Sequence, residues 1–269
     1  MTQQVPESRH TEHGDRDAAR GGEILRTVVG SGVHGIAIEG TDDHDELGIY
    51  VEPATSALGF TRPSEHYVWR TQPEGARSGP GDTDLVMYSV RKYLRLAVKG
   101  NPTALLPLYA PAADVLVTSE LGEELRALAP KILSQRAVRR FLGYMESQRA
   151  RLRGDGPRHG VPNRPELVAR YGYDVKYASH ALRLAYQGLE VARHGRLTLP
   201  MPDAEREHVR AVKRGERGEL ATVLDDIAAV QAQVEAVLAD GTSPLAEDAD
   251  VAAVTAWSVQ AHRRHWGWA

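Results

Sequence analysis

Residues 28–51 read VVGSGVHGIAIEGTDDHDELGIYV, and the order of features in this stretch decides the predicted fold. An apolar run ends at a Gly-Ser pair, a cluster of aspartates follows, and a second apolar run begins directly after it. Short apolar runs between turn signals predict two strands. The backbone and hydroxyl of Gly30 and Ser31 are suited to holding a triphosphate, and the aspartates are suited to the magnesium ion that bridges it.

The acidic cluster between the two predicted strands contains Asp42, Asp43 and Asp45. Residues two apart on an extended strand point to the same side, so Asp43 and Asp45 are expected to face one ligand together. Two such carboxylates repel each other unless a cation lies between them, and a hard divalent ion with oxygen ligands suits them. The alternative is a solvated acidic turn. The Gly-Ser turn before the cluster and the apolar runs on both sides favour the metal site.

A third carboxylate from a neighbouring strand would serve as a catalytic base or as a further metal ligand. Asp84 is the first candidate because it directly precedes the apolar residues 85–87, and Asp82 is the close alternative. His34 and His44 are also near the acidic cluster in the sequence. Each is a weaker candidate for a direct role, because surface histidines beside acidic loops commonly have none.

The composition excludes several classes of protein. The chain has 269 residues, of which 42% are hydrophobic and 26% charged, as in an ordinary globular protein with a sizeable core. A net charge of -3 gives no global basic signature, so any nucleic-acid contact would use a local patch. The absence of cysteine excludes a disulfide framework and a cysteine-based zinc site or nucleophile. We expect a cytoplasmic protein without a membrane partner, because neither a spanning run nor a signal peptide is found.

The expected architecture is α+β, with a small mixed-sheet core followed by an all-helical domain. A polar, flexible tail is expected over residues 1–22, the core over 23–118 and the helical domain over 119–269. Strands are predicted at residues 23–29, 47–51 and 66–70.

Helices are predicted from periodicity and from capping residues. A short helix is expected over residues 33–38. Residues 84–99 indicate an amphipathic helix, or a short strand end that runs into one. A Gly/Pro/Ser loop at residues 72–81 precedes it. The remaining predicted helices cover residues 103–109, 120–129, 138–153, 166–188, 205–240 with a break near Gly215 and Gly218, and 248–265.

Two predicted helices carry polar faces that suit a nucleotide. Four cations fall on one face of the helix predicted from about residue 86 to residue 99: Arg91, Lys92, Arg95 and Lys99. A basic face beside an acidic metal site suits a triphosphate or an RNA backbone. The alternative is the solvated face of an ordinary amphipathic helix.

The second polar face lies within residues 172–184, GYDVKYASHALRL, and comprises Tyr173, Lys176, His180 and Arg183. The opposite face is apolar and directed to a core. Such a helix suits a wall of a nucleotide cleft, with the tyrosine ring stacked on a base and with Lys176 and His180 on phosphates. The alternative is a surface helix that carries cations by chance.

The order of these blocks resembles a known enzyme superfamily. Gly30-Ser31 followed by Asp43-x-Asp45 is similar to the signature of the DNA polymerase β-type nucleotidyltransferases. Four blocks in order narrow the resemblance to the predicted nucleotidyltransferases of the RNA-ligase-associated and bacteriophage type. These blocks are residues 30–35, 41–53, 90–103 and 172–184, and the resemblance covers roughly residues 24–190.

The resemblance implies a minimal nucleotidyltransferase core sheet with a helical domain packed against the nucleotide. By the superfamily's pattern, Gly30 and Ser31 would hold the nucleotide phosphates. Asp43 and Asp45 would bind Mg²⁺, with Mn²⁺ as the alternative ion, and Asp84 would be the third carboxylate. The additional acid, Asp42, departs from the superfamily's pattern. It leaves open whether Asp42 and Asp43 or Asp43 and Asp45 face the metal ion, and strand geometry favours Asp43 and Asp45.

The implied reaction is transfer of a nucleoside monophosphate from an NTP to an acceptor, with release of pyrophosphate. An RNA end or a tRNA is the favoured acceptor, and a protein or a small molecule is the alternative. A non-catalytic nucleotide or RNA sensor is the competing class of function. The base preference and the oligomeric state are not readable from the sequence.

Overall fold

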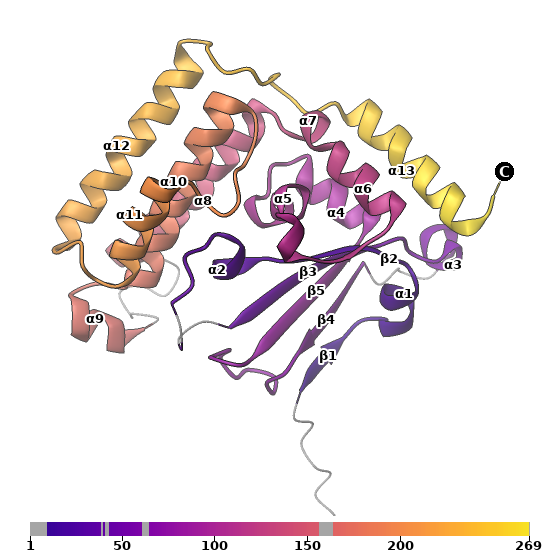
Figure 1. Cartoon of the computed structure of the whole chain (residues 1–269), viewed down its shortest axis with the longest axis horizontal. Helices are drawn as coiled ribbons and strands as arrows, with labels where there is room; N and C mark the ends of the chain where they lie inside the picture. The colour runs from indigo at the N-terminus through magenta and orange to yellow at the C-terminus, as the bar shows by residue number, and fades with distance from the viewer. Residues whose placement is uncertain (1–9, 39, 41–42, 61–64, 156–163, 269) are drawn as a thin grey trace, which may run out of the picture. The chain divides into compact units, whose positions relative to one another are not determined.

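The computed structural model describes residues 10–38, 40, 43–60, 65–155 and 164–268, and it confirms the α+β class (Figure 1). The chain forms two compact units. The first comprises Met1–Leu96, Leu106–Leu128 and Ala252–Ala269. The second comprises Ala97–Leu105 and Ala129–Val251.

A mixed sheet is the framework of the first unit. Its six strands, counted over the described residues, are ordered β1-β4-β5-β3-β2-β6. Only the central pair, β3 and β5, is parallel, and the other neighbours are antiparallel. The strands are β1 (Thr11–His13), β2 (Glu23–Val28), β3 (His44–Tyr50), β4 (His66–Arg70), β5 (Thr83–Ser89) and β6 (Val115–Thr118). The three strands predicted from the sequence are confirmed.

The helices of the first unit are mostly short. Ser119 caps α6 by accepting a hydrogen bond from the amide of Gly122, as the capping signal predicts. Helices α4 and α5 run across the limits between the two units. The helices are α1 (Arg16–Gly21), α2 (Gly30–Val33), α3 (Ala54–Leu58), α4 (Val90–Ala97), α5 (Pro102–Tyr109), α6 (Glu120–Ala127) and α13 (Val251–Trp266), with a 3-10 turn at Ala112–Asp114.

Close packing between the two parallel strands depends on a glycine. A Cβ atom on Gly48 of β3 would lie 2.7 Å from Cγ of Met87 on β5. Met87 is fully buried and belongs to a core cluster that includes Tyr50, Tyr67 and Leu85. A side chain at Gly48 would therefore push apart the two strands that carry the acidic residues.

The second unit is helical and is built around α10, which contacts α8, α11 and α12 (Figure 1). The apolar face predicted within residues 172–184 is buried, since Ala178, Ala181 and Leu182 have no accessible surface. No helix in the described parts of the chain is long and apolar enough to cross a membrane. The helices are α7 (Ala129–Ile132), α8 (Gln135–Arg153), α9 (Pro165–Tyr171), α10 (Val175–His194), α11 (Asp203–Lys213) and α12 (Leu220–Ala239).

The N-terminal region differs from the expected flexible tail. Residues 1–9 lie outside the described residues, but residues 10–22 contain β1 and α1. Asp15 caps α1, because its carboxylate accepts a hydrogen bond from the amide of Ala18 at 2.9 Å. Thr11 is the one buried residue of β1. A short edge strand with two exposed polar residues has no apolar alternation, so periodicity could not predict it.

Two helix predictions are wrong at their boundaries, and a third segment follows the second of its two alternatives. The helix expected over residues 33–38 covers Gly30–Val33 instead. Residues 83–89 form a strand, in which buried Leu85 and Met87 alternate with less buried neighbours, and this strand runs into the helix that begins at Val90. The helix predicted over residues 166–188 is interrupted by Gly172, whose φ of 81° ends α9.

A buried acid–base cluster ties α13 to the end of β3. Glu52 follows β3 and is 1% exposed. Arg91 Nε donates to Glu52 Oε1 at 2.5 Å, and His262 Nε2 lies 3.3 Å from Glu52 Oε2. Trp266 Nε1 donates to the Glu52 carbonyl at 3.0 Å. The cluster therefore joins the strand, α4 and the C-terminal helix of the same unit.

The ionised forms of this pair stabilise each other. Burial by itself would raise the pKa of the Glu52 carboxyl, but hydrogen bonds from His262 and Arg91 outweigh it and lower the pKa. Burial would lower the pKa of His262, but its hydrogen bonds with the Glu52 carboxylate and the Ser258 carbonyl raise it above the usual value.

We therefore expect folding stability to depend on pH through this pair. The raised His262 pKa gives stability that is complete below about 6.5 and is lost as pH rises through the folded-state pKa. The lowered Glu52 pKa gives stability that is present above about 4.3 and is lost as pH falls. His262→Ala should lower the free energy of unfolding by about 3 kcal/mol at pH 5.5 and by less at pH 9.

Urea denaturation followed by tryptophan fluorescence at both pH values measures this difference. His265→Ala is the matched control, since His265 lies on the same helix and is exposed. An equal loss of stability at pH 5.5 and pH 9 for His262→Ala would contradict the ionic role.

Candidate metal centre

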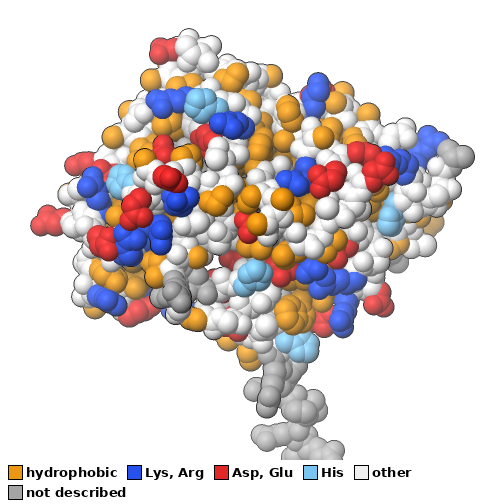
Figure 2. Space-filling model, viewed as in Figure 1, with side chains coloured by type: hydrophobic (Ala, Val, Ile, Leu, Met, Phe, Trp, Pro, Cys, Tyr) orange, Lys and Arg blue, Asp and Glu red, His pale blue; other side chains and the backbone are white. Residues whose placement is uncertain are grey.

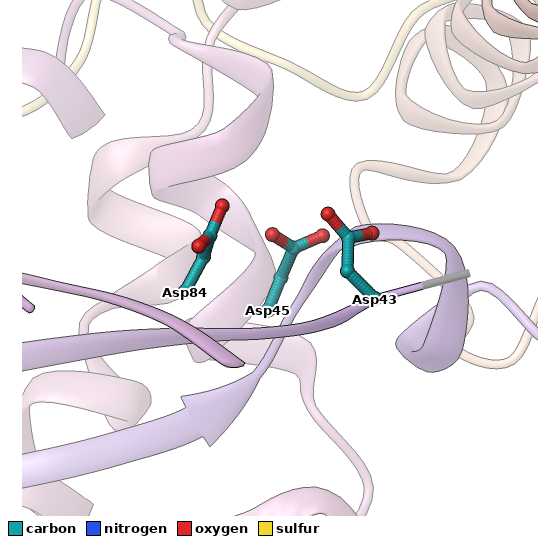
Figure 3. A group of neighbouring side chains, drawn as sticks. All are labelled: Asp43, Asp45 and Asp84. Carbon is teal, nitrogen blue, oxygen red and sulfur yellow. The ribbon is translucent and has the colours of Figure 1, made fainter. Parts of the chain in front are cut away.

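Three aspartates converge at the beginning of the parallel strand pair (Figure 3). Asp43 directly precedes β3, Asp45 is the second residue of β3, and Asp84 is the second residue of β5. One carboxylate oxygen from each residue lies within 4.8 Å of the other two. All three side chains are partly buried. The predicted trio is therefore brought together in space.

The strand geometry explains this convergence. Asp43 and Asp45 are two residues apart, so both point to the same side of the extended chain. Asp84 is the register partner of Asp45 in the parallel pairing of β3 and β5, which places its side chain on the same face. Asp42 lies outside the described residues.

Gly30 lies directly against the acidic cluster. Its φ of 67° is in the left-handed region that favours glycine, and it begins α2 after β2. A Cβ atom at this position would lie 2.0 Å from Oδ2 of Asp45. The amide of Val29 donates to the Asp45 carbonyl at 2.9 Å, which fixes this approach. The Gly-Ser turn, with half-buried Ser31, is thus the immediate neighbour of the carboxylates.

Asp84 is oriented by two residues from the loop between β4 and β5. Gln72 Nε2 donates to Asp84 Oδ1 at 2.8 Å, and the Ser78 hydroxyl donates to Asp84 Oδ2 at 2.7 Å. Gln72 is buried and also donates to Ser78 Oγ. Arg70 Nε lies 3.9 Å from Asp84 Oδ1. Sequence reasoning missed Gln72 and Ser78, because they lie in a segment that the composition describes only as a loop.

Asp82, the alternative third carboxylate, has a different position. Its Oδ1 accepts a hydrogen bond from the Thr71 hydroxyl at 2.8 Å, and its Oδ2 accepts one from the amide of Gly79 at 2.9 Å. These two bonds hold the pKa of the Asp82 carboxyl below its usual range. Asp82 therefore closes the loop between β4 and β5, while Asp84 belongs to the acidic trio.

The trio fits a hard divalent cation. Its three carboxylates supply oxygen ligands, and Mg²⁺ is commonly bound by one or two carboxylates together with substrate phosphate oxygens. Three neighbouring negative charges also repel each other strongly where solvent is partly excluded. Asp43, Asp45 and Asp84 are therefore the residues that could hold such an ion.

The acidic group found among the described residues includes neither of the two histidines that are near it in the sequence. His34 is 1% exposed, so its ring lies in the interior of the first unit. His44 is exposed, and its Nε2 lies 3.2 Å from Oε1 of Glu46. His44 and Glu46 share one face of β3, and Asp45 lies on the other face.

The basic residues of α4 have structural partners in the first unit. Arg91 is held by buried Glu52 and also donates to the Ala57 carbonyl at 3.2 Å. Lys92 Nζ lies 3.1 Å from Nδ1 of His66, and burial lowers the pKa of this lysine. Arg95 pairs with Glu65, and exposed Lys99 follows the end of α4.

The face drawn in Figure 2 has no continuous basic patch, because Lys and Arg side chains are interspersed with Asp and Glu. This distribution agrees with the net charge of -3. The predicted basic stripe thus contains two residues, Arg91 and Arg95, that are engaged in ion pairs.

The predicted polar face of residues 172–184 lies in the second unit. Tyr173 precedes α10 and is 3% exposed, whereas Lys176 is exposed in the first turn. Burial, together with the charges of Arg183 and two further arginines, lowers the pKa of His180 to about 3. Without a bound anion, His180 is therefore neutral at physiological pH.

One comparison with known proteins identifies the chain. The sequence model described as RlaP, RNA repair pathway DNA polymerase beta family, matches residues 15–240. The chain belongs to this family. Membership confirms the resemblance to polymerase β-like nucleotidyltransferases of the RNA-ligase-associated type. Neither the curated proteins nor the solved structures gave a match.

The family match runs from within the loop before α1 to the end of α12. It begins earlier and ends later than the resemblance read from the four sequence blocks, which covers roughly residues 24–190. The helices of the second unit up to α12 therefore lie within the region that the RlaP family model matches.

We expect Gly30→Ala to damage the acidic centre. The new methyl group would displace the Asp45 carboxylate, and the left-handed backbone would cost about 1 kcal/mol. Affinity for Mn²⁺, measured by electron paramagnetic resonance, should fall about 10-fold or more. Gly32→Ala is the matched control, because its Cβ would meet only Val28 Cγ1 at 3.3 Å. Equal affinities of the two variants would show that Gly30 does not govern the centre.

Proposed function

We propose that the protein is a Mg²⁺-dependent nucleotidyltransferase that moves a nucleoside monophosphate from an NTP to an acceptor hydroxyl and releases pyrophosphate. The observation that supports this proposal is the acidic trio of Asp43, Asp45 and Asp84 in contact with the Gly30 turn. Membership of the RlaP family gives independent support for nucleotidyl transfer.

Each part of the centre has a proposed role. The amides at Gly30 and Ser31 would hold the nucleotide phosphates close to the carboxylates. Asp43 and Asp45 would hold the metal ion, which when bound supplies Lewis-acid stabilisation of phosphoryl oxygens. Asp84 would orient the acceptor hydroxyl and receive its proton. Asp84 is suited to this role because neighbouring donors fix both of its oxygens.

Four residues of the predicted nucleotide-binding set belong to the second unit: Lys99, Tyr173, Lys176 and His180. Lys99 and Lys176 are exposed, and their role in nucleotide binding stays a prediction. In the first unit, Arg91 pairs with Glu52 and Lys92 lies beside His66, so these two cations would be less available to phosphates.

An RNA end or a tRNA is the favoured acceptor. This preference rests on the family's description as part of an RNA repair pathway. On the face drawn in Figure 2, where the charges are interspersed, RNA binding would depend on a few cations at one place. A protein or a small molecule as the acceptor gives different products in the experiment below.

Asp45→Asn should lower transfer from α-labelled NTP to an acceptor by about 100-fold or more, because it removes a charge from the metal-binding pair. The measurement incubates purified protein and Mg²⁺ with each labelled NTP, total cellular RNA, protein and small-molecule extract. Asp82→Asn is the matched control, since Asp82 only closes a loop, and it should keep transfer within a fewfold of the unsubstituted protein.

The labelled fraction identifies the acceptor class. Label in RNA that is lost in Asp45→Asn supports the favoured acceptor, and label in other proteins or in small molecules supports the alternatives. Binding of NTP and Mg²⁺ without any labelled product would contradict transfer and favour a nucleotide sensor.

A further inference from the structure

The Ser78 hydroxyl lies where an acceptor hydroxyl would be needed. Asp84 is the carboxylate assigned above to the acceptor, and a group that receives a proton must lie within about 2.6–3.2 Å of the donor oxygen. Ser78 Oγ lies 2.7 Å from Asp84 Oδ2. Ser78 thus meets the geometric condition that an acceptor hydroxyl would have to meet.

The hydrogen bonds around Ser78 also direct its proton. Gln72 Nε2 donates to Ser78 Oγ, so the proton of Ser78 is left to point at Asp84. A hydroxyl oxygen has two lone pairs, and the bond from Gln72 uses one of them. The other lone pair remains for attack on phosphorus. This pattern of a hydroxyl with an oriented base is typical of activated nucleophiles.

The loop that carries Ser78 is suited to presenting a side chain. Residues 73–77 are exposed, and Ser78 itself is partly exposed. Gln72 at the beginning of the loop is buried, and its carbonyl accepts a hydrogen bond from Thr11 Oγ1 at 2.9 Å. Gly79 and Asp82 close the other side. A fixed base therefore supports an accessible serine beside the acidic trio.

We infer that Ser78 is a site of self-modification, at which the protein transfers a nucleoside monophosphate to itself when no other acceptor is bound. This inference rests on the proposed nucleotidyl transfer. Ser78 Oγ attacks the α-phosphorus of the NTP, its proton passes to the Asp84 carboxylate, and the bond from the α-phosphorus to the bridging oxygen breaks. The products are a phosphodiester on Ser78 and pyrophosphate, so no further reactant is required.

The modification would limit itself. A phosphodiester on Ser78 adds a negative charge beside Asp84, removes the hydroxyl donor from Oδ2 and occupies the acceptor position. The modified protein should therefore be less active towards an external acceptor. One modified residue per chain is the expected limit.

The test is to incubate the whole protein with Mg²⁺ and each NTP without acceptor, followed by intact-mass measurement and peptide mapping. We expect an increase by one nucleoside monophosphate less one water, on the peptide that contains Ser78. Ser78→Ala should lose this adduct, and Ser78→Thr should retain it because the hydroxyl remains. Ser56→Ala, on α3 of the same unit, is the matched control and should leave the adduct unchanged.

A second measurement shows that the variant keeps the site. Thermal stabilisation by NTP with Ca²⁺, which does not depend on turnover, should be retained by Ser78→Ala, because Gly30, Asp43 and Asp45 are unchanged. If a nucleoside monophosphate is transferred to an external acceptor with release of pyrophosphate but no adduct is found on Ser78, the inference is overturned and Ser78 only positions Asp84. If no acceptor, external or internal, is modified, the proposed function itself fails.

Discussion

The parallel pairing of β3 and β5 is the constraint on which the acidic centre depends. Register places Asp45 beside Asp84, and the two-residue repeat of the strand adds Asp43 on the same side. A shift of one residue would turn one of these carboxylates to the opposite face of the sheet. Two features support this pairing. Gly48 of β3 lets the side chain of Met87 on β5 pack closely against it, and antiparallel strands flank the pair on both sides. The position of the carboxylates is thus a property of the sheet more than of a loop.

Residues with strong local signals were predictable from the sequence. Asp43 and Asp45 lie at the start of an apolar run, and their spacing alone predicts their common direction. Gln72 and Ser78 carry no such signal, because polar residues in a Gly- and Pro-containing loop have the same composition whether or not they bind a carboxylate. Their role becomes visible only when β4 and β5 pair as an antiparallel hairpin and bring the ends of the loop together.

The cations of α4 show a second limit of pattern reasoning. Arg91 and Arg95 were placed on one helical face by periodicity, and periodicity cannot distinguish a solvated face from a face that meets acidic residues distant in the sequence. Glu52 and Glu65 supply those acids. Arg91 also belongs to the cluster around Glu52. Trp266 of α13 donates a hydrogen bond to Glu52 from about 200 residues further along the chain, a separation that no local signal can predict.

The hairpin between β4 and β5 has a cross-linked base, which positions Asp84, and an exposed tip. Consecutive residues at its beginning bind alternate aspartates at its end: Thr71 binds Asp82, and Gln72 binds Asp84. These two cross-links make a rigid base below an exposed tip at residues 73–77. Motion or insertion in the tip is therefore not transmitted to the third carboxylate. Such a hairpin can tolerate changes of sequence at its tip while the position of Asp84 is preserved.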